Sequence, residues 1–270
     1  MRNAVTENLR VRIPVWDIKV DPMRPEDVVD WIARRDRNVA RTLVGHNLHS
    51  AYLSCTNRDF RRFCAASDLR LVDGFPILVL VNLLLAFRGV SPIHGKYRTG
   101  STDWLPLLNG LPAGFRVAVI GASRESNEKA VAALSSRCQD LDIRGWDGFS
   151  GLGELVSGEF SEINDFAPDL ILIGLGMPNQ EAFISKHRDY LPNSVYATVG
   201  GAIDQIAGVQ RNAPRSVGRF GLEWLWRLVH EPRRMWRRYL VEPLLLGWVT
   251  ALMAKRIAVG RFRSRGGHWK

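Results

Sequence analysis

The sequence has few cysteines and no long apolar run. Cys55, Cys64 and Cys138 are an odd number without CxxC spacing, which argues against a disulfide framework or a zinc site and is typical of a reducing compartment. The longest apolar segments, Pro76–Phe87 and Pro243–Ala254, fall well short of the roughly 20 residues of a membrane-spanning helix. The first of them predicts a buried helix. The N-terminal segment has acidic residues and no apolar centre, so no secretory signal is expected.

Acidic residues are scarce in one part of the chain only. The net charge of the 270 residues is +10, yet residues 1–209 carry 23 Lys and Arg against 24 Asp and Glu, whereas residues 210–270 carry 14 against 3. A nucleic-acid-binding protein usually carries a basic face on its folded body. The asymmetry instead predicts a nearly neutral body, residues 1–208, and a basic appendage, residues 209–270, that faces an anionic partner.

Short β-branched runs alternate with amphipathic segments, which is typical of a parallel sheet wrapped by helices. We therefore predict an α/β fold with a Rossmann-like, mostly parallel sheet, flanking helices and a basic helical C-terminal appendage. The expected strands are Arg41–Gly45, Leu69–Val72, Arg116–Ile120, Ile143–Gly145, Leu170–Ile173 and Val195–Val199.

The turn Gly121-Ala122-Ser123 joins an expected strand to a helix that Ser123 is placed to cap. Such turns hold phosphates in many α/β proteins, because the helix N-terminus offers free N–H groups. The same turn also occurs for packing alone. Both interpretations remain open for this segment.

Other expected strands also end in polar residues or glycine. Asp73 follows one strand, Gly176, Gln180 and Glu181 follow another, and the segment from Gly201 to Asp204 follows a third. Ligands of open α/β sheets bind at the carboxyl ends of the strands, so these residues are candidates for a site. For Asp73 the alternative is a simple helix cap.

Several short blocks of residues follow one another along the chain: His46-Asn47, Val72-Asp73-Gly74, Tyr97–Asp103, Asp147-Gly148-Phe149, Pro168-Asp169, Gly174–Glu181, Val199–Gly208, Arg211–Arg215, Leu222–Leu228 and Glu231–Tyr239. In their residues and their order, these blocks resemble the WecG/TagA/CpsF family of glycosyltransferases. The resemblance covers about residues 40–240, and the family usually has Thr-x-Asn where this chain has Gly45-His46-Asn47.

The resemblance implies transfer of a sugar from a UDP-sugar to a polyprenyl-pyrophosphate-linked saccharide at the cytoplasmic face of the membrane, with inversion to a β-linkage. It makes Asp73 the general base. If Asp73 is only a helix cap, Asp204 or Asp103 is expected to be the base instead. Asn47 is expected to position substrate hydroxyls. Uridine recognition is expected from Gly121, Ala122, Ser123, Gly176, Gln180, Glu181, Gly201 and Asp204.

No metal is expected. The single Asp-x-Asp motif, Asp140-Leu-Asp142, precedes its strand and so lies at the wrong end of the sheet. Arginine can instead compensate the charge of the departing UDP, since its guanidinium is planar and permanently charged. The candidates are Arg98, Arg211, Arg215 and Arg227, each with a plain surface role as the alternative.

The appendage combines arginines with aromatic residues such as Trp224, Trp236, Tyr239 and Trp248. This composition suits the headgroup region of an anionic membrane, and Leu244–Ile257 has helical apolar spacing. For this appendage, packing on the body and RNA binding are the alternatives.

For the whole protein, two rival functions remain. One is a nucleotide-binding oxidoreductase, which the absence of GxGxxG disfavours. The other is a basic nucleic-acid-binding or scaffold protein. Neither the sugar nor the oligomeric state follows from the sequence.

Overall fold

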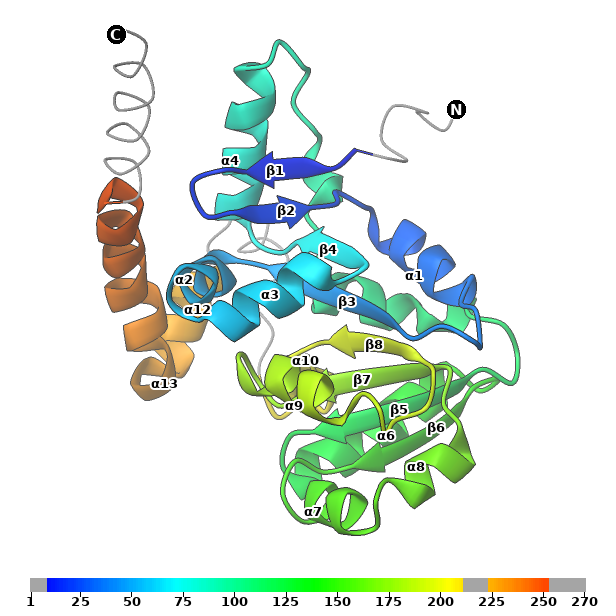
Figure 1. The fold of residues 1–270 in the computed structure, drawn as a ribbon. Helices are drawn as coiled ribbons and strands as arrows, with labels where there is room; N and C mark the ends of the chain where they lie inside the picture. Colours follow the sequence, from blue (N-terminus) through cyan, green and yellow to red (C-terminus); the bar gives the residue numbers. More distant parts are fainter. Residues whose placement is uncertain (1–8, 211–222, 253–270) are drawn as a thin grey trace, which may run out of the picture.

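A computed structural model describes residues 9–210 and 223–252 (Figure 1). Its centre is a parallel sheet with the strand order β4-β3-β8-β7-β5-β6, and the predicted α/β fold is thereby confirmed. Each predicted strand is present within a residue or two of its expected bounds. The strands are β3 (Arg41–His46), β4 (Leu69–Val72), β5 (Arg116–Gly121), β6 (Asp142–Trp146), β7 (Leu170–Gly174) and β8 (Val195–Thr198).

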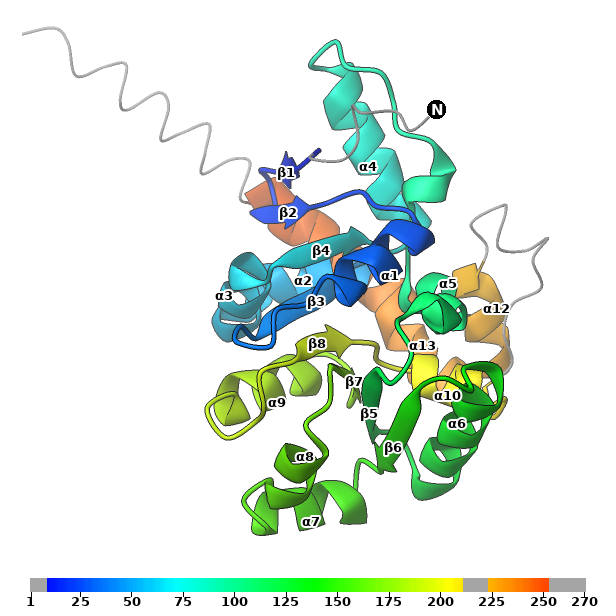
Figure 2. The same cartoon turned by 90° about the vertical axis from the view of Figure 1, so that its right-hand side faces the viewer.

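Helices cover both faces of the sheet because successive strand residues point to opposite sides. Val117 and Val119 of β5 join one core cluster, whereas Ala118 and Ile120 join another. Figure 2 shows α6 and α10 on one side of the sheet and α3 and α9 on the other. The helices of the body are α1 (Pro25–Ala33), α2 (Leu48–Thr56), α3 (Arg58–Ala66), α4 (Phe75–Ala86), η1 (Gly95–Tyr97), α5 (Ser101–Trp104), η2 (Leu105–Gly110), α6 (Arg124–Arg137), α7 (Ser150–Ser157), α8 (Ser161–Phe166), α9 (Asn179–His187) and α10 (Ala202–Ile206).

An antiparallel hairpin precedes the sheet and was not predicted. Its strands, β1 (Val11–Ile13) and β2 (Ile18–Val20), have only three residues each. Both follow the burial pattern buried-exposed-buried, which places their apolar residues against α4. The hairpin therefore extends the core beyond the β4 edge of the sheet.

Helix α4 corrects one expectation. The apolar run at Pro76–Phe87 does form a helix, but the prediction that it is buried is wrong. Ile77, Val81 and Leu85 are buried against the hairpin, whereas Leu83 is 51% exposed and Phe87, which follows the helix, is 88% exposed. One side of α4 has nothing from the described part of the chain packed on it.

Residues 223–252 of the appendage are helical apart from a bend at Glu231. They comprise α12 (Glu223–His230), α13 (Pro232–Trp236), the π-helical turn η3 (Arg237–Val241) and a further helix over residues 242–252, which we call the C-terminal helix. Leu246 of that helix is buried in the same cluster as α4 and the hairpin, and Trp16 Nε1 donates to Thr250 Oγ1 over 2.8 Å. The appendage is thus packed on the body.

Candidate active site

A cavity of about 410 Å³ lies at the carboxyl ends of β3, β4, β7 and β8. Four segments that directly follow these strands contribute to its wall, as expected for ligand sites of parallel sheets. The predicted residues that line it are Asn47, Asp73, Arg98, Asp103, Gly176, Gln180 and Gly201. The catalytic residues expected from the sequence are therefore brought together in one cavity.

Asp73 is held by Asn47. Asn47 Nδ2 donates to Asp73 Oδ2 over 3.0 Å, while Asn47 Oδ1 accepts from the backbone N–H of Ser50 and so caps α2. Because both ends of its amide are engaged, Asn47 fixes the position of the carboxylate. Helix α4 is capped at Gly74 without a side-chain hydrogen bond, so the interpretation of Asp73 as a helix cap is not supported.

A second carboxyl group lies in the same corner. Asp103 Oδ2 accepts from the backbone N–H of Gly100 over 2.8 Å, and burial, partly offset by that hydrogen bond, raises the pKa of Asp103. A Cβ atom on Gly100 would lie 2.6 Å from Asp73 Oδ1. Only glycine fits at this position, since any side chain would displace the Asp73 carboxylate.

Gln180 faces the cavity and Glu181 lies behind it. The backbone N–H of Gly200 donates to Gln180 Oε1 over 3.1 Å, and Gln180 Nε2 donates to Glu181 Oε1 over 2.9 Å. Glu181 is 2% exposed and its Oε2 has no partner among the described residues. Burial raises the pKa of Glu181 to about 7. Glu181 is therefore a support for the Gln180 amide and does not line the cavity.

The raised pKa of Glu181 makes stability depend on pH. Since it exceeds the ordinary value of 4.5, the folded state holds an extra proton between about pH 4.5 and 7, and the free energy of unfolding falls as the pH rises through that window. We expect Glu181→Gln to remove this loss. Relative to the parent chain, the variant should gain on the order of 3 kcal/mol between pH 4 and 8 in urea unfolding.

The control for this prediction is Glu154→Gln, because Glu154 is an exposed residue of α7. Its free energy of unfolding should equal that of the parent chain at each pH. The contribution of His46, whose pKa burial lowers to about 4, is common to all three proteins and cancels in the differences. A Glu181→Gln variant with the same pH dependence as the parent would show that Glu181 is ionised in the folded state across this range.

The Gly121-Ala122-Ser123 turn does not line the cavity. Ser123 Oγ accepts from the backbone N–H of Ser126 over 3.2 Å and caps α6, as predicted. Gly121 has a φ of +122°, and a Cβ on it would lie 2.6 Å from the backbone of Gly174. Close contact between β5 and β7 thus accounts for this glycine, which favours the packing interpretation of the turn.

The remaining predicted residues lie elsewhere. Asp204 is on α10, where its carbonyl oxygen accepts from Val209 and Gln210, and it does not line the cavity. Arg211 and Arg215 lie outside the described residues. Arg227 is on α12, and its side chain is outside the description as well. Asp142 begins β6 beside the first residue of β5, at the edge opposite the cavity.

The appendage forms one wall of the cavity through residues that were not predicted as site residues. Trp224, Arg238, Tyr239 and Pro243 line it. His49 of α2 lines it too, and its Nδ1 lies 2.5 Å from Oε2 of Glu242 at the start of the C-terminal helix. Burial, followed by the positive charge of Arg238, lowers the pKa of His49.

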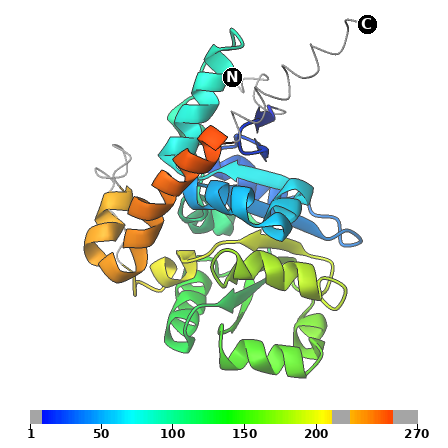
Figure 3. The ribbon, with the colours of Figure 1, turned by 60° about the vertical axis from the view of Figure 1, so that its left-hand side comes forward.

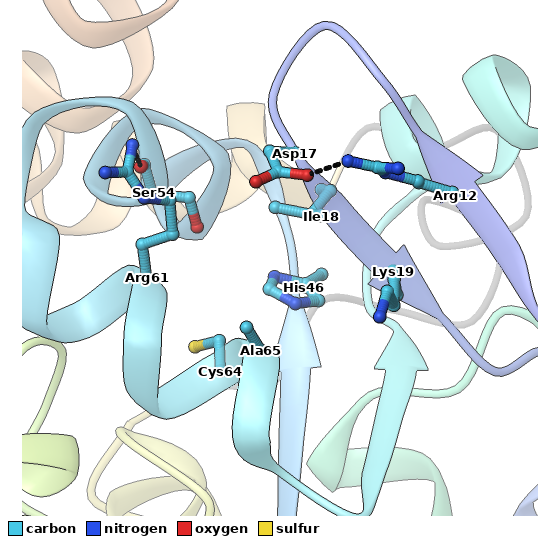
Figure 4. A pocket seen from close by; sticks show the side chains of 9 residues that line it. All are labelled: Arg12, Asp17, Ile18, Lys19, His46, Ser54, Arg61, Cys64 and Ala65. Carbon is cyan, nitrogen blue, oxygen red and sulfur yellow. Dashed lines mark hydrogen bonds and ion pairs between the residues drawn. The ribbon is translucent and has the colours of Figure 1, made fainter.

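A smaller cavity of about 260 Å³ lies on the hairpin side of β3 (Figure 4). Arg12, Lys19 and Arg61 contribute to its wall, and the buried Ser54 Oγ has no partner among the described residues. None of the predicted catalytic or binding residues lines it. The larger cavity is therefore the candidate active site.

Comparison with known proteins decides the family. The model of the glycosyl transferase WecG/TagA/CpsF family matches residues 13–258. The chain belongs to this family. The blocks that carry the resemblance to the WecG/TagA/CpsF family supply most of the wall of the larger cavity, from Asn47 and Asp73 to Tyr239. The chain is accordingly a glycosyltransferase.

Two relatives in Bacillus are N-acetylglucosaminyldiphosphoundecaprenol N-acetyl-beta-D-mannosaminyltransferases. The protein of Bacillus subtilis (strain 168) is 28% identical over 220 residues, which is 80% of this chain and 82% of the relative. That of Bacillus spizizenii (strain ATCC 23059 / NRRL B-14472 / W23) is 29% identical over 220 residues, 81% of this chain and 80% of the relative. The similarity to each of these relatives thus extends over about four fifths of both chains.

The described residues contain neither a metal-binding cluster nor a membrane-spanning helix. No three His, Cys, Asp or Glu side chains come together there as a metal-binding group. In the same part of the chain, no helix has the length and apolar character needed to cross a bilayer.

Proposed function

We propose that this glycosyltransferase moves a sugar from a UDP-sugar to a polyprenyl-pyrophosphate-linked saccharide, with inversion at the anomeric carbon and without a metal, in cell-surface or exopolysaccharide synthesis. The main support for this proposal is the Asp73 carboxylate, which Asn47 holds in the wall of the cavity. Gln180, Arg98 and Arg238 line the same cavity. The enzyme is proposed to bind peripherally to the cytoplasmic face of the membrane.

The proposed reaction is a single displacement. Asp73 takes the proton of the acceptor hydroxyl, the oxygen forms a bond to the anomeric carbon, and the bond from that carbon to the UDP oxygen breaks. UDP leaves with the electron pair of that bond and so gains negative charge. Arg98 and Arg238, both in the cavity wall, compensate this charge as preorganised cations.

The acceptor and the stereochemistry have support from the relatives. Their names specify an N-acetylglucosaminyl group on diphosphoundecaprenol as the acceptor and a beta-linked N-acetylmannosaminyl group as the group transferred to it. A β-linkage from an α-linked nucleotide sugar requires inversion, which needs one base and no covalent intermediate. A single well-held carboxylate such as Asp73 suits that requirement.

The body, residues 1–208, is proposed to bind the nucleotide and supply the base. The appendage, residues 209–270, is proposed to complete the cavity and to bind an anionic membrane. The appendage residues in the cavity wall support the first of its roles. Its 14 Lys and Arg against 3 Asp and Glu in residues 210–270 support the second.

The function is tested with labelled UDP-sugars, beginning with UDP-N-acetylmannosamine, and polyprenyl-pyrophosphate-linked N-acetylglucosamine in detergent. Product that depends on both substrates is the expected result.

Thermal shift with UDP, NAD and RNA separates the glycosyltransferase from the rival functions, since a ligand at 100 times its Kd stabilises the folded protein by about 2.7 kcal/mol. Stabilisation by NAD and not by UDP would favour the oxidoreductase, and stabilisation by RNA would favour the nucleic-acid-binding alternative.

The same assay tests the absence of a metal. We expect turnover to be unchanged by EDTA, because the arginines of the cavity wall take the role that Mg²⁺ held by two carboxylates has in other transferases. Rates are measured with EDTA and with added Mg²⁺ or Mn²⁺. Loss of turnover with EDTA and its recovery with either ion would contradict the prediction.

A further inference from the structure

Helix α4 carries an exposed apolar stripe. Phe75, Val79, Leu83 and Phe87 follow one another at intervals of four residues, and 47%, 39%, 51% and 88% of their surfaces are exposed. Residues four apart share one face of a helix, so these side chains form one continuous band, which we call the α4 stripe. Soluble surfaces rarely hold such a continuous band without a partner.

The charge around the α4 stripe has one sign. Residues 74–102 contain three Lys and Arg and no Asp or Glu. Arg88 directly follows Phe87, and both Arg88 and Lys96 are exposed. An apolar band bordered by cations matches the boundary between acyl chains and anionic headgroups. A second copy of the same face, in contrast, would bring its cations against these cations.

The α4 stripe begins at the candidate active site. Phe75 and Pro76 line the cavity, and the helix leads away from it. In Figures 1 and 2, α4 projects beyond the sheet. Figure 3 shows the C-terminal helix, in orange to red, running toward α4. Leu244 and Trp248 of this helix are exposed. Both helices thus start at the cavity wall, at Phe75 and Pro243, and both carry exposed apolar side chains.

We propose that the α4 stripe inserts into the headgroup region of an anionic bilayer and turns the cavity mouth toward the lipid. Phe75 then lies where a membrane-bound substrate enters. The role in substrate entry rests on the proposed function, since it assumes a lipid-linked acceptor. Insertion itself does not depend on the reaction and is measured without substrate.

The direct test places an environment-sensitive dye on the α4 stripe. NBD is attached to Leu83→Cys in a Cys55→Ser background, because Cys64 and Cys138 are buried and Cys55 is partly accessible. With phosphatidylcholine vesicles that contain phosphatidylglycerol, we expect a severalfold rise in emission and quenching by brominated acyl chains. The control, dye at the exposed Val39→Cys just before the amino end of β3, should show neither. Equal signals at both positions, or no signal at Leu83→Cys, would overturn the proposal.

A second test measures binding by sedimentation with the same vesicles. We expect Leu83→Gln/Phe87→Gln to bind at least about tenfold more weakly than the parent chain, a difference of about 1.4 kcal/mol. The control is Val39→Gln/Val156→Gln, which also replaces two exposed apolar side chains and should bind like the parent. Equal binding by the stripe variant and the parent would contradict insertion.

Two further measurements separate membrane insertion from self-association and from catalysis. If sedimentation velocity shows that the parent is a dimer and Leu83→Gln/Phe87→Gln a monomer, the stripe binds a second copy and the proposal fails. On acceptor in detergent, the stripe variant should retain the parent's turnover. Vesicle insertion in a protein inactive with every UDP-sugar would overturn the proposed function and leave the insertion established.

Discussion

Replacing Asp73 by Asn is expected to lower turnover by about 10²–10⁴-fold, the range typical for loss of a general base. The amide has the shape of the carboxylate and retains an oxygen for Asn47 Nδ2, which donates to Oδ2 over 3.0 Å. It cannot take a proton from the acceptor hydroxyl. UDP binding should therefore be unchanged in calorimetry while the initial rate of sugar transfer falls.

Asp103→Asn is the matched control for Asp73→Asn, because its carboxyl lies in the same corner and accepts from the Gly100 N–H. The variant oxygen can still accept that bond, so turnover should fall by much less. A greater loss in Asp103→Asn than in Asp73→Asn would make Asp103 the base. Near-normal turnover in Asp73→Asn would leave this residue a structural role only.

The sheet could be predicted from the sequence because each central strand is a short apolar run bounded by turn residues. β5, for example, is buried in all but its first residue and ends at Gly121. The hairpin could not be predicted, since β1 and β2 have three residues each and strands so short carry no readable period. Their pairing depends on contact with α4, which only the fold provides.

The burial of α4 was predicted wrongly for a physical reason. A helix with apolar residues on every side is normally enclosed, and the sequence of Phe75–Ala86 has that composition. Whether protein, lipid or water covers each side is a property of the whole molecule. The structure leaves the side with Val79 and Leu83 uncovered, and the same composition therefore suits a membrane surface.

The part of the site that directly follows strands could be predicted from the sequence. Asn47, Asp73, Gln180 and Gly201 each follow a different strand of the sheet, and all of them reach the cavity. The Gly121–Ser123 turn also follows a strand, β5, but β7 lies between β5 and the other strands whose ends form the cavity. The order of strands in a sheet is not encoded in local sequence patterns. The sequence therefore could not show that this turn, unlike the others, lies outside the cavity. No sequence signal pointed to His49 either, because its partner Glu242 is far away in the sequence, in the appendage.

A chain that ends at Gly208 is expected to lose turnover by about 10²-fold or more, the cost of removing a preorganised charge from such a site. It lacks Trp224, Arg238, Tyr239 and Pro243 of the cavity wall. The body should still fold, since Leu246 is the one residue of the described appendage in the buried core clusters. Circular dichroism and thermal unfolding check the fold, and the rate on acceptor in detergent checks the site.

A point variant separates the effect of the Arg238 charge from that of the rest of the appendage. Arg238→Gln keeps the helices and removes one charge from the cavity, so its turnover should approach that of the truncated chain, with vesicle binding only slightly weaker. Arg233→Gln, on exposed α13, removes the same charge outside the cavity wall and should turn over normally. Full turnover by the chain that ends at Gly208 would mean that the body alone forms the active site. Normal turnover in Arg238→Gln would assign the loss on truncation to the enclosure that Trp224 and Tyr239 provide, because the charge would then be dispensable.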